Sequence, residues 1–195
     1  MEIRKHSKSI IYVLLLFSAV ACKTKESYFY DDAETPGVAI FSNKNNNVMS
    51  CFIDGRPWQT ISRTQGGWGP SDFEVYIRKR YLDSLTDVLS ISWEGSSASG
   101  GGEVSLYLTV AKNFGYRDFN KLQGQRMSID GVKNYFTLSG GRGAGFIYFN
   151  TVSLDSNVYG IQGKMSGLLN ADFNRSKLSS GRFDHSLSGA EVQLY

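Results

Sequence analysis

Apolar and polar side chains alternate one by one along three segments in the middle of the chain. Val75 lies between polar neighbours in segment 73–78, and the same period recurs in 89–94 and 104–110. Successive side chains of a β-strand point to opposite faces of the sheet. The period therefore predicts strands with one buried and one solvated face.

Shorter apolar runs predict further strands, and glycine-rich turns separate them. The runs span residues 49–53, 60–64, 126–129, 135–138, 146–154, 159–173 and 192–195, and one helical turn is predicted at 118–122. Asp54-Gly55, Asp130-Gly131 and the glycine clusters 95–102 and 140–145 predict turns, because glycine adopts the positive backbone angles of hairpins. Glycines inside 159–173 predict bulges or a sharp bend. This pattern favours an all-β, antiparallel β-sandwich, with a closed lipocalin-like β-barrel as the alternative.

The first 22 residues have the organisation of an export signal. Basic residues up to Lys8 precede an apolar run from Ile10 to Ala21, which is too short for a membrane-spanning helix of about 20 residues. Ala19-Val20-Ala21-Cys22 suits the ordinary signal peptidase, which would release a soluble protein. The same residues resemble a bacterial lipobox, and we favour lipidation of Cys22. Several acyl chains at about 0.8 kcal/mol per buried methylene give stable anchoring in a membrane.

This interpretation divides the chain into a signal peptide (1–21), a lipidated tether (22–47) and one all-β domain (48–195). The tether is polar and without a sustained period, although residues 38–41 are apolar enough to dock as an edge strand. Cys51 lies in an apolar stretch, so we expect it in the core. A disulfide to Cys22 is the alternative if Cys22 is not lipidated.

The apparent basicity of the chain comes largely from the leader. Three of the 21 basic residues and one of the 18 acidic residues lie in residues 1–21, which leaves a net charge near +1. There is no long basic run, so no nucleic-acid partner is expected.

Two stretches resemble a known family. Cys51-Phe52-Ile53-Asp54-Gly55-Arg56-Pro57-Trp58 resembles the opening strand, D-G-x-x-W turn and packed tryptophan of small uncharacterised lipoproteins of Bacteroidetes-type bacteria. Residues 160–167 and 171–173 are similar to their C-terminal glycine-bearing strand. The resemblance covers the leader and these two stretches. It implies a lipid-anchored protein of the outer membrane, facing the periplasm or the cell surface, and says more about fold than about activity.

Catalytic and metal-binding patterns are sparse. His185 is the only histidine after the leader, which excludes a multi-histidine metal site, and no cofactor or catalytic residue is predicted. Asp184-His185-Ser186 is predicted to lie in a turn or at a strand end. Glu74, Glu94 and Glu103 are carboxylates that a glycan hydrolase could pair, but their predicted faces are solvated.

Aromatic side chains are the most suggestive set. Trp68 lies on a glycine-rich loop, and Tyr76, Tyr107 and Tyr116 fall on polar faces or in a loop, so the four could line a shallow platform that stacks on sugar rings. The alternative is that Trp68 caps the core. Trp58 and Trp93 are expected in the core. We therefore expect a noncatalytic binding module for a glycan or an envelope protein. The alternatives are a glycan hydrolase with paired carboxylates and a carrier of small hydrophobic ligands.

Overall fold

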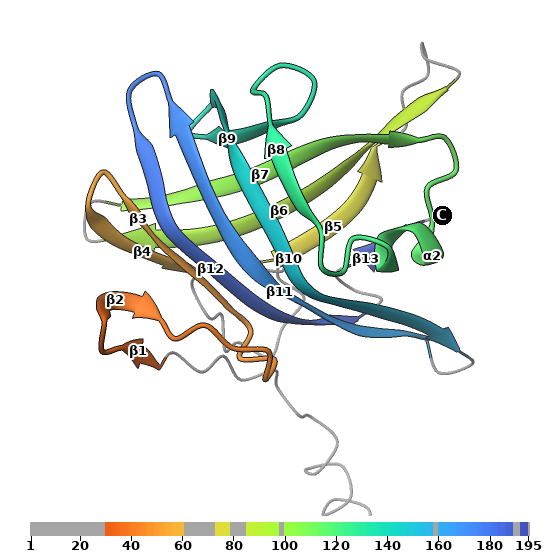
Figure 1. Cartoon of the computed structure of the whole chain (residues 1–195), viewed down its shortest axis with the longest axis horizontal. Coiled ribbons are helices and arrows are strands. Elements are labelled where there is room, and N and C mark those ends of the chain that lie inside the picture. The colour runs from red at the N-terminus through yellow and green to blue at the C-terminus, as the bar shows by residue number, and fades with distance from the viewer. Residues whose placement is uncertain are drawn as a thin grey trace, which may run out of the picture.

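A computed structural model of the chain describes residues 30–60, 73–78, 85–97, 100–157, 160–188 and 192–194. Most of these residues lie in strands (Figure 1). The elements are β1 (Asp31–Asp32), β2 (Thr35–Ala39), β3 (Val48–Ile53), β4 (Arg56–Thr60), β5 (Phe73–Arg78), β6 (Thr86–Ser97), β7 (Gly100–Ala111), α2 (Tyr116–Asn120), β8 (Arg126–Ile129), β9 (Tyr135–Leu138), β10 (Gly141–Asn157), β11 (Gly160–Phe173), β12 (Lys177–Ser188) and β13 (Val192–Gln193).

Eight of the described strands close into an antiparallel barrel. Around the wall they follow the chain in the order β3, β4, β6, β7, β9, β10, β11, β12, and β12 then pairs with β3. The all-β prediction is confirmed. The sheet takes the barrel form that the sequence left as the alternative, instead of the sandwich that it favoured, because β12 joins β3 and leaves no separation into two sheets.

Short strands extend two edges of this wall. β6 pairs with β4 near its end and with β5 along the rest of its length. β10 likewise has two partners on one side: residues 141–143 pair with β9, and residues 145–148 pair with β8. β13 lies parallel to β5. No helix in the described part of the chain is long and apolar enough to cross a membrane.

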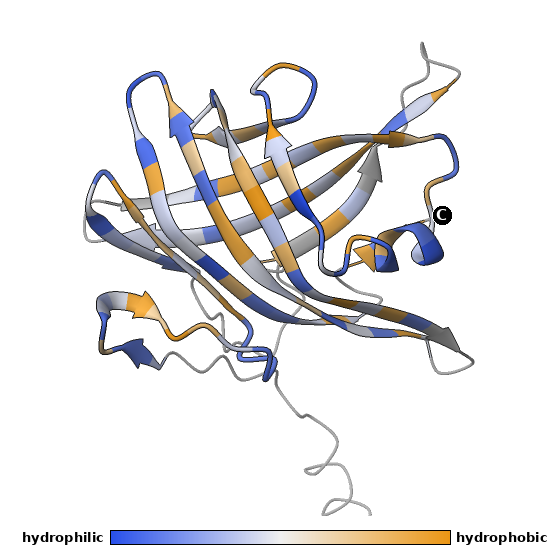
Figure 2. Ribbon diagram, in the orientation of Figure 1, coloured by the Kyte–Doolittle hydropathy of each residue, from blue (hydrophilic) through white to orange (hydrophobic). Residues whose placement is uncertain are grey.

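Large side chains fill the middle of the barrel. The ring centroid of Phe183 lies 5.5 Å from that of Trp93 and 6.1 Å from that of Phe149, and all three residues are at most 1% exposed. Figure 2 shows the alternation of polar and apolar residues along the strands that produces this core. Trp58 and Cys51 are buried as expected, and burial raises the pKa of the Cys51 thiol well above its ordinary value.

Glycines allow the long strands β10 and β11 to lie against each other where the wall bends. A Cβ atom on Gly145 would lie 2.0 Å from the carbonyl oxygen of Asn170, and one on Gly167 would lie 2.0 Å from that of Tyr148. The register shifts beside both sites, between Phe149 and Thr151 and between Leu169 and Ala171. The predicted bulges in 159–173 are therefore confirmed.

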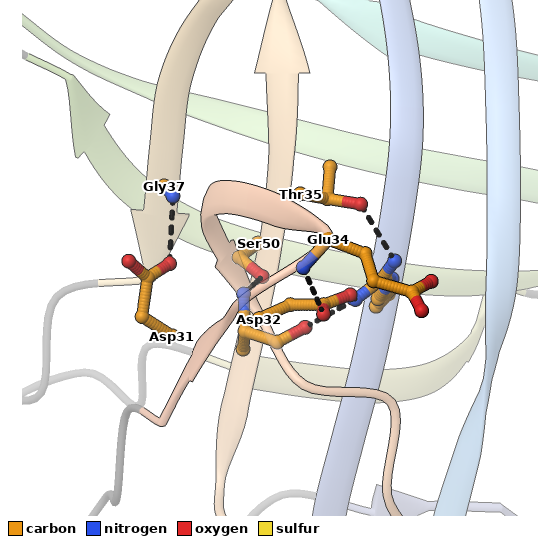
Figure 3. Close-up of polar contacts among 8 residues, drawn as sticks. Asp31, Asp32, Glu34, Thr35, Gly37 and Ser50 are labelled. Carbon is orange, nitrogen blue, oxygen red and sulfur yellow. Dashed lines mark hydrogen bonds and ion pairs between the residues drawn. The ribbon is translucent and has the colours of Figure 1, made fainter.

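The N-terminal hairpin β1–β2 packs on the outer face of β3 and β12 (Figure 3). The Arg182 guanidinium forms an ion pair with Asp32 and donates to the carbonyl oxygen of Ala39 at 3.0 Å. The backbone N–H of Ala39 in turn donates to Oγ of Ser50, at 2.7 Å. Asp32 and Ala39 fall within the predicted tether, so its described part, residues 30–47, lies against the barrel. Residues 22–29 lie outside the described residues.

The loop that follows the hairpin is held by one buried carboxylate. Asp184 accepts hydrogen bonds from the backbone N–H groups of Lys44, Asn45 and Asn46 at 3.0 to 3.2 Å, and from the Ser42 hydroxyl. Asp184 lies inside β12, so the prediction of a turn or strand end at residues 184–186 is wrong. A strand escaped prediction here because its hydrophobic period changes phase at a bulge beside Ser180.

Candidate ligand-binding site

Four hairpins meet at one end of the barrel and surround an open pocket, which we call the mouth. They join β3 to β4, β6 to β7, β9 to β10 and β11 to β12. The mouth has a volume of about 810 Å³, within the range of small-ligand sites. Its lining residues are Ile53, Asp54, Arg56, Trp58, Ser97, Gly102, Leu138, Ser139, Gly141, Arg142, Phe173, Asn174, Arg175 and Ser176.

The mouth is hollow because several inward positions there carry no side chain. Gly102 lies on the face of β7 that also carries the buried Val104, so its missing side chain would point inward. A Cβ atom there would meet nothing within 4 Å. At Gly141 the nearest atom would be the carbonyl oxygen of Leu138, at 3.4 Å. The space that large side chains fill deeper in the barrel is therefore left open at this end.

Apolar and aromatic groups form the inner wall of the mouth. Trp58 is only 3% exposed and packs against Gly95, where a Cβ atom would lie 2.4 Å from the indole ring. Phe173 and Leu138 are half-buried and are also packed against the core. These groups offer a ligand an apolar surface next to a solvent-exposed rim.

Arginines dominate the charge of the rim. Arg56, Arg142 and Arg175 line the mouth, together with a single carboxylate, Asp54. Oδ1 of Asp54 accepts a hydrogen bond from the backbone N–H of Lys177, at 2.7 Å. Among the described residues, neither Arg56 nor Arg175 forms an ion pair.

The three arginines differ in direction. Arg56 shares a strand face with the inward Trp58, since the two residues are two positions apart in β4. Arg142 pairs with Thr137 on the outer face, and its guanidinium lies 4.1 Å from the ring centroid of Tyr135. Arg56 and the turn residue Arg175 are therefore the cations best placed to meet a ligand. An anion with an apolar part would fit both the rim and the wall.

The residues predicted as an aromatic platform are only partly brought together. Tyr76 pairs with Ser90, and Ser90 pairs with Tyr107, so the two tyrosines lie in one row on the outer wall. Tyr107 also stacks on Tyr135, with ring centroids 4.9 Å apart. Tyr116 lies apart from this row, on α2, packed against the core. Trp68 and Cys22 lie outside the described residues.

Tyr135 is the member of this row that sequence reasoning missed. It begins β9, whose bounds were predicted correctly, but its partner Tyr107 lies 28 positions earlier in the chain. The pairing of β7 with β9 is a property of the closed wall, so no local pattern predicts it.

The candidate carboxylates do not gather in the mouth. Glu94 and Glu103 face each other across β6 and β7, on the outer face, and Glu103 is exposed. Within the described ranges, no three histidine, cysteine or carboxylate side chains form a group that could hold a metal ion. His185 is buried in the barrel, where its ring stacks on Phe73 at 4.1 Å between centroids.

No family model, curated protein or solved structure matches the chain. The geometry of the mouth and of the outer tyrosine row therefore carries the functional conclusion.

Proposed function

We propose that this protein is a lipid-anchored, noncatalytic binding protein of the bacterial envelope, and that its mouth binds a small anionic ligand with an apolar or aromatic part. One observation carries the proposal. Arg56 and Arg175, without carboxylate partners among the described residues, stand at the rim of a hollow of about 810 Å³ whose inner wall includes Trp58 and Phe173. A charge-assisted hydrogen bond and an aromatic wall together select an amphipathic anion.

This proposal modifies the carrier of small hydrophobic ligands that the sequence left open. Up-and-down barrels of eight strands are a form in which ligand carriers occur, which supports binding at one end of such a barrel. The middle of this barrel is filled by Trp93, Phe149 and Phe183. The ligand is therefore held at the mouth, and the arginines favour an anion over an uncharged apolar molecule.

A pair of fluorescent probes tests the charge preference. Anilinonaphthalene sulfonate carries an aromatic system and one negative charge, whereas phenylnaphthylamine is a similar aromatic molecule without the charge. We expect the sulfonate to bind with the higher affinity. Replacing Arg56→Gln and Arg175→Gln together should weaken sulfonate binding by about tenfold or more, since a hydrogen bond to a charged group contributes about 1.5 to 3 kcal/mol. The amine should bind the double variant as it binds the wild type.

A second variant tests the location of the probe. Gly102→Leu adds a side chain where Cβ meets open space, so it should fill part of the mouth without disturbing the wall. It should abolish binding of both probes. Arg117→Gln, an exposed change on α2, is the matched control and should bind as the wild type does. Sulfonate binding that survives both the double arginine change and Gly102→Leu would show that the mouth is not the site.

The outer tyrosine row supports a second candidate function, glycan binding. The stacked, half-buried rings of Tyr107 and Tyr135, with the exposed Arg142 over Tyr135, form an aromatic and cationic surface of the kind that sugars stack on. Titration with cell-envelope oligosaccharides, followed by NMR, should perturb Tyr107 and Tyr135. Tyr135→Ala should remove the binding, and Trp68→Ala tests whether that residue contributes. Unchanged affinity in both variants would leave the mouth as the only proposed site.

The hydrolase alternative receives less support. Asp54 is the only carboxylate among the residues that line the mouth, and a glycosidase needs two. Glu94 and Glu103 are neighbours on the outer wall, outside that pocket. Hydrolysis of an envelope glycan that is lost in Glu94→Gln and in Glu103→Gln would restore the enzymatic interpretation.

A further inference from the structure

We infer that a small apolar patch beside the N-terminal hairpin inserts into the interfacial region of the membrane and fixes the orientation of the barrel relative to the bilayer. The patch consists of Tyr30, Ile40 and Phe41, whose exposed fractions are 57%, 48% and 40%. The backbone N–H of Ile40 donates to the carbonyl oxygen of Tyr30, at 2.7 Å, so the two ends of the hairpin bring Tyr30 next to Ile40 and its neighbour Phe41.

The patch is close to the proposed anchor. Tyr30 follows Cys22 by eight residues, and an extended chain spans at most about 28 Å over that length. A lipid on Cys22 therefore keeps the patch within that distance of the bilayer surface. Lys23 and Lys25 lie in the link, and Lys44 is exposed just beyond the patch. Cations near the surface favour anionic lipid headgroups.

The composition and size of the patch favour lipid over a protein partner. Aromatic side chains collect at membrane–water interfaces, and an isoleucine beside them adds apolar area that can enter the acyl boundary. A stable protein interface buries about 800 Å² on each partner, from 20 or more residues. Three side chains are too few for that, but they suffice to orient a domain that is already anchored.

This contact leaves the mouth free. The chain is fixed at Ala39, whose N–H donates to Ser50, and again at Lys44 to Asn46, whose N–H groups donate to Asp184 opposite Val48. Ile40 and Phe41 therefore lie beside the half of β3 that is farther from its mouth end at Ile53. Figure 1 shows the hairpin on the side of the barrel, below the four mouth hairpins. A bilayer at the patch would face the wall of the barrel and not its opening.

Site-specific fluorescence tests the orientation without depending on lipidation. The mature chain, residues 22–195 with Cys22→Ser and an N-terminal histidine tag, is held on phosphatidylethanolamine and phosphatidylglycerol vesicles by a nickel-chelating lipid. Cys51 is buried with a raised thiol pKa, so it does not compete for a thiol-reactive fluorophore. Single cysteines are introduced as Asn43→Cys beside the patch and Asn174→Cys at the mouth, both at exposed positions.

A lipid with a quencher in its headgroup region should remove most of the fluorescence at position 43 and little at position 174. Adding Ile40→Ser and Phe41→Ser should reduce the quenching at position 43 to the level at position 174, while the tag keeps the protein on the vesicles. Equal quenching at both positions in the wild-type background, or no effect of the two serines, would overturn the inference. Fatty-acid labelling of Cys22 in cells tests the anchor separately, so the two can fail independently.

Discussion

The two ends of this barrel use inward-facing positions in opposite ways. In the middle and at the far end, inward positions carry Trp93, Phe149 and Phe183, and the glycines are pressed against neighbouring backbone. At the mouth, Trp58, Phe173 and Leu138 form an inner wall, but Gly102 faces empty space and Arg56 lies at the rim. The same alternating pattern thus builds a packed core and, a few residues farther along the same strands, a hollow. The packed and hollow regions differ in their side chains and not in their backbone. Single substitutions can therefore test the difference between them.

The largest difference in stability is expected when the same substitution, glycine to valine, is made at one glycine in each region. Gly167→Val should prevent folding, because its Cβ would lie 2.0 Å from the carbonyl oxygen of Tyr148 and 2.5 Å from the ring of Phe183. The Cβ atom of Gly102→Val would meet no atom within 4 Å, so the free energy of unfolding of this variant should stay within about 1 kcal/mol of the wild type. Thermal unfolding followed by circular dichroism measures both. Similar melting temperatures for the two variants would contradict the contrast between the ends.

A second comparison removes one phenyl ring from each region. Phe183→Ala should lower the free energy of unfolding by about 3 to 5 kcal/mol, since it leaves a cavity among buried rings. Phe173→Ala, in the half-buried wall of the mouth, should cost less than about 2 kcal/mol. Urea denaturation monitored by tryptophan fluorescence gives both values. An equal loss at the two positions would mean that the mouth wall is as much a part of the core as the middle of the barrel.

The filled half is also braced from outside, through Asp184. Asp184→Ala removes the acceptor of three backbone N–H groups and one hydroxyl, and should cost about 2 to 4 kcal/mol because these buried and partly buried donors lose their partner. Ser42→Ala, which removes only the hydroxyl, is the control and should cost about 1 kcal/mol. Hydrogen exchange should show faster exchange of the amides of residues 44–46 in Asp184→Ala. Unchanged exchange there would mean that the loop does not depend on the carboxylate.

The smallest effect on stability is expected when low pH protonates Asp32 in the hairpin. The side-chain hydrogen bond from Arg182 holds the pKa of Asp32 below its ordinary value of 3.8. The folded pKa is therefore lower than the unfolded one, so the pair stabilises the hairpin above about pH 4 and loses this contribution as pH falls through the lowered pKa. Stability measured from pH 6 to pH 2 should show wild type and Asp32→Asn converging at low pH. A difference that stays constant over this range would exclude the ion pair as its cause.

Strand positions were largely predictable, but closure and the pocket were not. The alternation at 104–110 and the runs at 126–129 and 135–138 gave strands that the structure contains. β12 was missed because the inward set changes phase between Leu178 and Phe183, at the bulge beside Ser180. That strand is the one that pairs with β3 and closes the barrel, so its omission left sandwich and barrel undecided.

The mouth escaped prediction for a different reason. It is defined by missing side chains at Gly102 and Gly141 and by arginines more than 100 residues apart in the chain, such as Arg56 in β4 and Arg175 in a turn. The hydrophobic periodicity of a segment predicts which of its side chains are buried. A cavity that is lined by absent side chains leaves no such periodicity in the sequence. The aromatic platform was predicted from single strands, and only the row of Tyr76 and Tyr107 had a geometric basis in their pairing through β6.

The contacts of β12 with the N-terminal segment have a mechanical consequence for the anchor that we propose at Cys22. Tension on the N-terminus reaches first the contacts of Arg182 and Ser50 with the hairpin and then those of Asp184, before it reaches Val48, the first residue of β3. Each of these contacts joins a side chain on the outside of the wall to the segment, so we expect them to break before the backbone pairing of β3 with β12. We therefore expect the segment to protect the closure of the barrel from a force applied at that proposed anchor.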